Sequence, residues 1–214
     1  ITNGQLPQKI RNIPELELLD NICFSLDGNR EGNDYIRGKG SFDKVMESIA
    51  EIRKYYKTPI KICSTIHKYV INDAEFIAEF VKRNNINWNI NFLFGGDEKL
   101  DGENLALSNN AMKKYVMKLI ELKKFGYPVF ISNAALNYII KWLDHSDSVF
   151  LSERELLEKK IDNPVKCQYG NYEIFIDNDL KVYPCPILQN KFDAKSIAEA
   201  GFDEAFNNLV NKTC

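Results

Sequence analysis

Several motifs that mark common ligand sites are missing from this sequence. It has only two histidines among 214 residues and no HExxH spacing, so a histidine-based metal centre is not favoured. Neither GxxxxGK[ST] nor GxGxxG occurs, which excludes the P-loop and the dinucleotide fingerprint. The formal net charge is only -2, and this argues against nucleic acid as a partner because phosphate binding requires a basic surface.

Long hydrophobic runs are missing as well. No stretch of about 18 apolar residues occurs, so we expect no membrane span, and no signal peptide is visible. An odd number of cysteines without a secretory signal indicates reduced thiols in a cytoplasmic protein rather than a disulfide framework. The five are Cys23, Cys63, Cys167, Cys185 and Cys214. Because the sequence opens on Ile1 rather than Met and stops on a cysteine, we expect both ends to be cut from a longer chain.

The first 145 residues alternate strand and helix patterns. Short apolar or β-branched runs predict strands at 21–26, 60–66, 86–94 and 127–132. Apolar residues at helical spacing predict helices at 41–56, 72–85, 108–126 and 133–145. The expected helix signals are caps at Ser41 and Ser108, a capping box from Asn72 to Glu75, and a terminating Gly126. This alternation predicts a parallel sheet with right-handed crossovers.

Ligands of parallel α/β sheets bind at the carboxyl ends of the strands. The residues expected at these ends are Asn3, Ser25, Asp27, Thr65, His67, Gly95 and Asp97.

The segment 28–40 follows the first predicted strand and reads as a glycine-rich loop that carries Arg30 and Arg37. Cys23 and Cys63 lie inside strands with apolar neighbours, so core packing is favoured over chemistry for them.

The pattern changes after residue 145. Residues 146–166 are charged and read as a connector with one helix. Residues 171–176 and 180–184 then predict two short strands of a hairpin around the turn sequence DND. The hairpin would bring Cys167 and Cys185 together. They are either small hydrophobic residues or two ligands of an iron–sulfur or zinc site, with Cys214 as a third.

Four segments taken in order resemble the radical S-adenosylmethionine (SAM) superfamily, in its peptide- and protein-modifying branch with a SPASM or Twitch extension. They are ITNG at 1–4, SLDG at 25–28, NDYIRGKGSF at 33–42 and CQYGNYEIFIDNDLKVYPCP at 167–186. The resemblance implies an α/β fold: an incomplete parallel (β/α) partial TIM barrel with a small cysteine-rich β-hairpin extension. It divides the chain into a barrel part (1–145), a connector (146–166) and an auxiliary-cluster region (167–214).

The resemblance also implies the ligands and their sites. SAM would lie across the carboxyl ends of the strands, against Asn3, Ser25 and Arg37, with Asp27 shaping the end of its strand. Cys167, Cys185 and Cys214 would ligate an auxiliary 4Fe-4S cluster. The full enzyme would take an electron from a donor such as flavodoxin or ferredoxin and abstract hydrogen from a peptide or protein substrate.

The sequence departs from the family pattern in four places. The CxxxCxxC motif for the radical-generating 4Fe-4S cluster and the GGE segment are absent, and we expect both before Ile1. Leu180 stands where the family often has glycine, and Pro186 stands where sulfatase-maturing members have Asp. We also expect the strand ending at Asn3 to have neighbours that these residues do not supply. The alternative is a non-catalytic α/β module with a structural metal hairpin that binds a nucleotide-like ligand.

Overall fold

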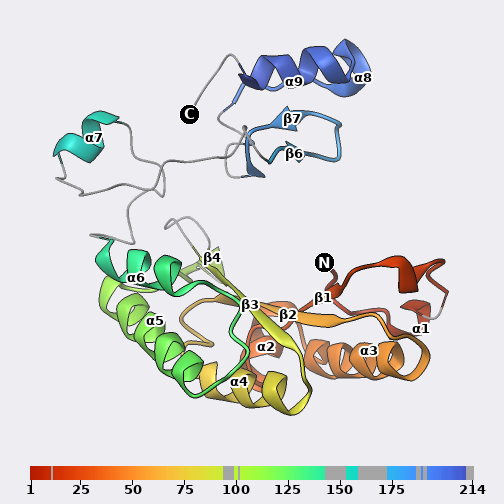
Figure 1. Cartoon of the computed structure of the whole chain (residues 1–214), viewed down its shortest axis with the longest axis vertical. Coiled ribbons are helices and arrows are strands. Elements are labelled where there is room, and N and C mark those ends of the chain that lie inside the picture. The colour runs from red at the N-terminus through yellow and green to blue at the C-terminus, as the bar shows by residue number, and fades with distance from the viewer. Residues whose placement is uncertain are drawn as a thin grey trace. The chain divides into compact units, whose positions relative to one another are not determined.

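The structure is a computed structural model that describes residues 1–10, 12–93, 99–100, 102–142, 153–158, 173–186, 189 and 192–210. The chain forms two compact units, Ile1–Phe150 and Leu151–Cys214 (Figure 1). In these described ranges, no helix has both the length and the apolar character that crossing a membrane would require.

A parallel sheet is the centre of the first unit. Its strands are β1 (Ile22–Ser25), β2 (Ile60–Ile66) and β3 (Asn87–Phe92), in that spatial order. Parallel bridges widen it on both sides, from Thr2 to Phe24 and from Trp88 to Val129. The strand expected at 127–132 is therefore reduced to the bridge at Val129. No strand among the described residues pairs with the far side of Thr2, and the expectation of missing neighbours there stays a prediction.

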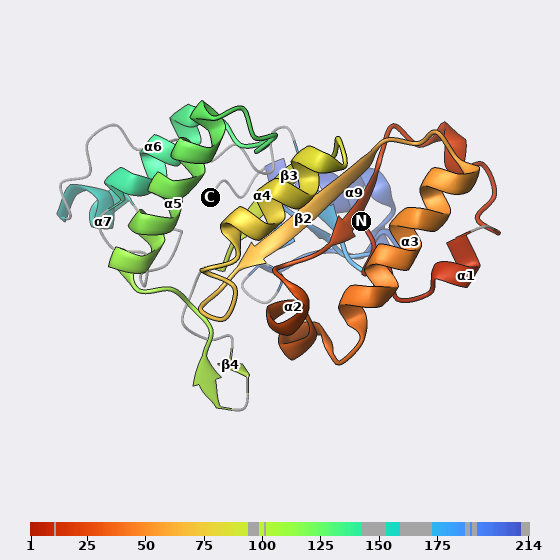
Figure 2. The same ribbon diagram turned by 90° about the horizontal axis from the view of Figure 1, so that it is seen from below.

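The three longest helices of the first unit lie on one side of this sheet. Figures 1 and 2 show α3 (Ser41–Tyr55), α4 (Ala74–Arg83) and α5 (Asn109–Lys124) on the same side. The remaining helical elements of this unit are α1 (Pro7–Ile10), η1 (Leu16–Leu18), α2 (Arg30–Arg37) and α6 (Asn133–Lys141). The βα alternation and the parallel pairing confirm the predicted fold class.

The two faces of the sheet differ in chemistry because its strands alternate apolar and polar residues. One face presents Phe24, Ile62, Ile66 and Trp88, which belong to the buried core together with Ile49 and other residues of the helices. The other face carries the polar alternates Cys23, Ser25, Lys61, Cys63, Thr65, Asn87, Asn89 and Asn91. Parallel sheets are usually apolar on both faces. A polar second face is therefore the exception that calls for a functional explanation.

Three predictions about where helices begin were wrong. Residues 30–37 form helix α2 rather than part of a loop, because the Asn29 side chain accepts from the backbone N–H of Gly32 at 3.0 Å and caps it. Helix α3 has Gly40 at its N-cap, so Ser41 is its first residue and not its cap. Helix α4 has Asp73 at its N-cap, which rules out the expected capping box at Asn72.

The signals for helix α5 are confirmed. The Ser108 hydroxyl accepts from the backbone N–H of Ala111 at 3.3 Å, and Gly126 follows the helix in the left-handed region at φ 76°. Between β3 and this helix lies a short antiparallel pair, β4 (Lys99–Leu100) and β5 (Glu103–Asn104), in a segment for which no strand was predicted.

The second unit contains the predicted hairpin. Its strands β6 (Phe175–Ile176) and β7 (Val182–Tyr183) pair antiparallel, and Asp177 Oδ1 accepts from the backbone N–H groups of Asp179 and Lys181 in the turn, both at 2.9 Å. The unit also contains α7 (Glu153–Glu158), α8 (Ile197–Ala200) and α9 (Phe202–Val210). Val182, Ala205 and Leu209 form its small buried core.

Candidate functional site

A cavity of about 380 Å³ opens at the carboxyl ends of β1, β2 and β3. This volume is within the range of small-molecule sites, and this edge is where parallel α/β sheets bind ligands. The residues that line it are Asn3, Gln5, Asp27, Ile36, Arg37, Thr65, His67, Leu93 and Leu105. Three of the four predicted cofactor residues, Asn3, Asp27 and Arg37, therefore share one cavity.

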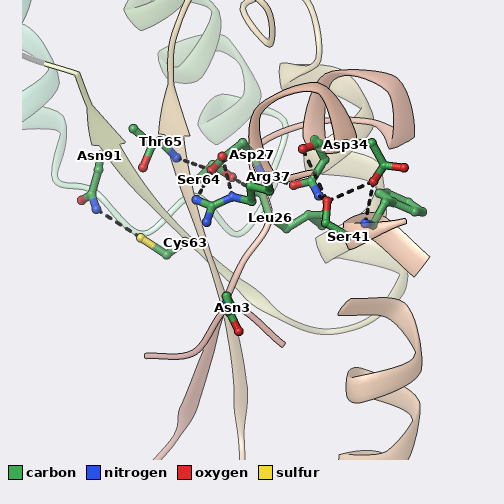
Figure 3. A network of polar contacts seen from close by, with 12 residues as sticks. Asn3, Leu26, Asp27, Asp34, Arg37, Ser41, Cys63, Ser64, Thr65 and Asn91 are labelled. Atoms are coloured by element: carbon green, nitrogen blue, oxygen red, sulfur yellow. Dashed lines mark hydrogen bonds and ion pairs between the residues drawn. The ribbon is translucent and has the colours of Figure 1, made fainter. Parts of the chain in front are cut away.

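Asp27 and Arg37 are joined by two hydrogen bonds (Figure 3). Arg37 donates from Nε to Asp27 Oδ2 at 2.7 Å and from Nη2 to Oδ1 at 2.9 Å. The backbone N–H of Thr65 on β2 donates to the same Oδ1 at 2.8 Å. The Asp27 side chain is 1% exposed and the Arg37 side chain 25%. The carboxylate is thus a buried anchor in the cavity wall, and the guanidinium is the more exposed part of the pair.

Helix α2 brings Arg37 back over the end of β1. Asn33, fully buried in this helix, accepts from the Asp27 backbone N–H at 3.0 Å and donates to the Ser41 hydroxyl at 2.9 Å. Asp34 caps helix α3 by accepting from the backbone N–H groups of Gly40 and Phe42, both at 2.8 Å. The polar residues of segment 33–42 therefore fix the return path of the chain, which explains their density in the sequence.

Gly28 is required by a close approach inside the protein. A Cβ at this position would lie 2.3 Å from Asp73 Oδ2 and 2.8 Å from Val70 Cγ1. Asp73 approaches so closely because it accepts from the backbone N–H and the side-chain amide of Asn29, both at 2.9 Å. The glycine of the SLDG segment thus has a structural reason that does not depend on a ligand.

His67 is a cavity residue that the sequence did not favour as a ligand. It is 2% exposed, and its Nδ1 accepts from the backbone N–H of Tyr69 at 3.3 Å. Its Nε2 has no hydrogen-bond partner in the described part of the chain. Burial lowers the pKa of His67, nearby Arg37 acts in the same direction, and Asp27 and Asp73 oppose them. Its place after β2 was the only signal that could have found it.

Cys23 and Cys63 form a thiol pair on the polar face of the sheet. The hydrogen bond from Cys63 lowers the pKa of Cys23 to about 7 against the effect of burial, and the same pairing raises the pKa of Cys63. Asn91 Nδ2 donates to Cys63 Sγ at 3.3 Å. Cys23 is buried as expected, but neither thiol belongs to the apolar core cluster.

The remaining predicted site residues lie apart from the cavity lining or outside the described residues. Ser25 pairs with Cys63 in the register of the sheet, and its backbone N–H donates to Thr2 O at 2.9 Å. Cys185 is a buried free thiol. Cys167 and Cys214 fall outside the described residues, and the described part of the chain contains no group of three or more His, Cys, Asp or Glu residues arranged to hold a metal ion.

Comparison with known proteins relates the fold to a SAM-binding enzyme. No family model matches the sequence. A curated protein of Methanothermobacter thermautotrophicus, described as an uncharacterized protein, is 32% identical over 107 residues, which are 49% of this chain and 40% of that protein. Among solved structures, native anSMEcpe with bound AdoMet (SAM) matches 98% of this chain and 57% of its own, with a TM-score of 0.62 and 17% identity.

A second structure, native anSMEcpe with bound AdoMet and Cp18Cys peptide, matches 99% of this chain and 56% of its own, with a TM-score of 0.61 and 17% identity. anSMEcpe is a radical SAM SPASM enzyme. At this identity the likeness shows the fold alone: this chain matches part of a radical SAM partial barrel. It spans somewhat more than half the length of that enzyme.

Proposed function

We propose that the chain is part of a radical SAM enzyme that modifies a peptide or protein. The observation that carries the proposal is the cavity itself: the Asp27–Arg37 pair lies at the carboxyl edge of a parallel sheet whose fold matches that of an AdoMet-bound enzyme. The neighbour with a bound peptide supports the substrate class.

The cavity residues fit SAM in chemical type. The guanidinium has five N–H groups, so Arg37 can donate to a second acceptor, such as the methionine carboxylate, while it holds Asp27. Asn3 and Gln5 offer amide groups beside it, and Ile36, Leu93 and Leu105 offer apolar surface for a purine. Ser25 would approach the ribose from the end of β1, the strand that leads to Asp27. SAM and a 4Fe-4S cluster supply the 5′-deoxyadenosyl radical when both are bound, and these residues bind and orient the nucleoside.

The auxiliary cluster remains part of the proposal. Cys167, Cys185 and Cys214 would be its ligands, since soft thiolates are what such clusters require. Cys185 lies shortly after strand β7, and the turn that precedes this strand contains Leu180 in the left-handed region at φ 59°. This is the conformation that glycine adopts at no steric cost, so the backbone there fits the family's glycine despite the leucine.

Calorimetric titration with SAM tests the proposal. Arg37→Ala should weaken binding by about 1.5–3 kcal/mol, the scale of hydrogen bonds to charged groups. Arg30→Ala is the matched control, because Arg30 begins the same helix and forms an exposed ion pair with Asp43. Equal affinity of the wild type and Arg37→Ala would contradict the assigned role. Binding of SAM without cleavage by the reduced, cluster-loaded full-length protein, which would include the CxxxCxxC segment, would favour the binding module instead.

A further inference from the structure

His67 carries an unpaired hydrogen-bond donor inside the cavity wall. Because Nδ1 accepts from the Tyr69 backbone N–H, the proton of the neutral ring is assigned to Nε2. That N–H is buried and has no partner among the residues that the structure describes. A buried unpaired donor is rare because it has lost its hydrogen bond to water, so its retention calls for an explanation.

The cavity changes character along the edge of the sheet. Asn3, Asp27 and Arg37 lie at the end near β1, and Leu93 and Leu105 come from the segments after β3. His67 follows β2, which lies between β1 and β3. A ligand with a charged group at one end and a flat apolar ring at the other would therefore lie against His67. The part next to His67 would be the middle of the ligand or the edge of the ligand's ring.

We propose that His67 donates a hydrogen bond from Nε2 to the nucleoside half of the bound ligand, at a ring nitrogen or a sugar oxygen. The inference rests on the proposed SAM site and adds a recognition residue to it. A SAM molecule with its methionine end at Arg37 would place its purine against Leu93 and Leu105 and its acceptors beside His67. Because Nε2 is buried in this structure, the imidazole of His67 must turn slightly toward the cavity to reach the ligand. This turn breaks no hydrogen bond of Nε2.

The protonation state of His67 is consistent with this role. Burial and Arg37 both lower its pKa, so the ring stays neutral near pH 7 and keeps Nδ1 available to Tyr69. A neutral donor in this position suits an uncharged acceptor of a nucleoside better than the carboxylate of an amino acid, for which a cation is the stronger partner.

The test measures the affinity of two probes, SAM and 5′-methylthioadenosine, which keeps the nucleoside and lacks the amino acid. His67→Leu should weaken both by the same factor, about three- to tenfold, the range expected for one hydrogen bond. His67→Gln, which keeps a side-chain N–H, should recover part of the loss. Asn89→Ala is the matched control, because Asn89 Oδ1 is the other buried side-chain atom of the described residues without a partner and does not line the cavity.

Three outcomes are distinguishable. Equal weakening of both probes by His67→Leu supports the inference. Unchanged affinity in His67→Leu, or weakening for SAM alone, overturns it and leaves the proposed SAM site intact. Failure of the wild type to bind either probe overturns the proposed function and the inference with it. A measurement without any variant is the imidazole Nε2–H resonance of the wild type, which should appear in the free protein and shift when either probe is added.

Discussion

Arg37 holds Asp27 through two near-parallel hydrogen bonds, and the two residues are unequally exposed, at 25% and 1% of their side chains. The pair joins the last turn of α2 to the end of β1, and Thr65 ties the same carboxylate to β2. Two consecutive elements, β1 and α2, therefore meet the sequence-distant strand β2 at one buried carboxylate. The binding surface of Arg37 depends on this anchor, so the site and the stability of the fold are coupled here.

Asp27→Asn should lower the free energy of unfolding by about 1–3 kcal/mol. The amide can still accept from Thr65, but it cannot neutralise Arg37. We expect a smaller loss of stability than for a fully buried ion pair, because Arg37 is partly exposed to solvent. Urea unfolding of the two proteins measures the difference. Asp43→Asn removes the carboxylate of α3 from its exposed ion pair with Arg30 of α2 and should change stability much less than Asp27→Asn does. A loss in Asp27→Asn no larger than in this control would mean that Asp27 is not an anchor.

Gly28→Ala should destabilise the protein by about 2–4 kcal/mol, because its Cβ would overlap the Asp73 carboxylate and the Val70 side chain. Asp73→Ala removes the closer of the two obstacles. The double variant should therefore be more stable than the sum of the two single losses predicts, which a double-mutant cycle measures by thermal unfolding. Strict additivity would show that the Asp73 contact does not explain the glycine.

Strand positions and the fold class followed from the sequence because they depend on local periodicity. The run at 60–66 became β2 with the same bounds, and Ser108 capped its helix as expected. The prediction of a loop at 28–40 was wrong because residues 30–37 form helix α2. The four glycines of the segment had favoured a loop. There Asn29 binds Asp73, which is distant in sequence, and Asn33 and Asp34 bind Ser41 and Phe42, each eight residues further on. These hydrogen bonds stabilise α2 and start α3.

The candidate site was predictable in part for the same reason. Its position at the strand ends follows from parallel topology, so Asn3 and Asp27 could be named in advance. The pairing of Asp27 with Arg37 could not, because it depends on how α2 turns the chain back. His67 was underrated because a single histidine carries no motif, and only its burial and unpaired nitrogen distinguish it.

Leu180→Gly should raise the free energy of unfolding of the hairpin unit by about 1 kcal/mol. Leu180 occupies the left-handed region at φ 59°, which costs a residue with a Cβ about 1–2 kcal/mol. Glycine removes that strain, and the entropy of the unfolded chain offsets part of the gain. Leu180→Ala is the control, since it removes the half-exposed side chain but keeps the Cβ and the strain. Equal stability of the glycine and alanine variants would show that the backbone there is not strained.

The shifted pKa values of Cys23 and Cys63 predict that stability depends on pH, in one way between pH 7 and 9 and in the opposite way above pH 9. The folded pKa of Cys23 is lowered to about 7 from an ordinary value of 9.0, so the folded protein releases this proton first. The resulting stabilisation is fully present above pH 9 and is lost as the pH falls from 9 toward 7. The pKa of Cys63 is raised, so above pH 9 the unfolded chain ionises this thiol more easily and stability declines.

The wild type should therefore show a rise in unfolding free energy between pH 7 and 9, at most about 2.7 kcal/mol from a shift of two pKa units, followed by a fall at higher pH. Urea unfolding at several pH values, with thiolate absorbance as a direct probe, measures both limbs. Cys63→Ala removes the donor, so the pKa of Cys23 should return toward or above 9 and the rise should disappear. If the rise persists unchanged in Cys63→Ala, Cys63 does not lower the pKa of Cys23. Another charge near Cys23 would then be responsible for the rise.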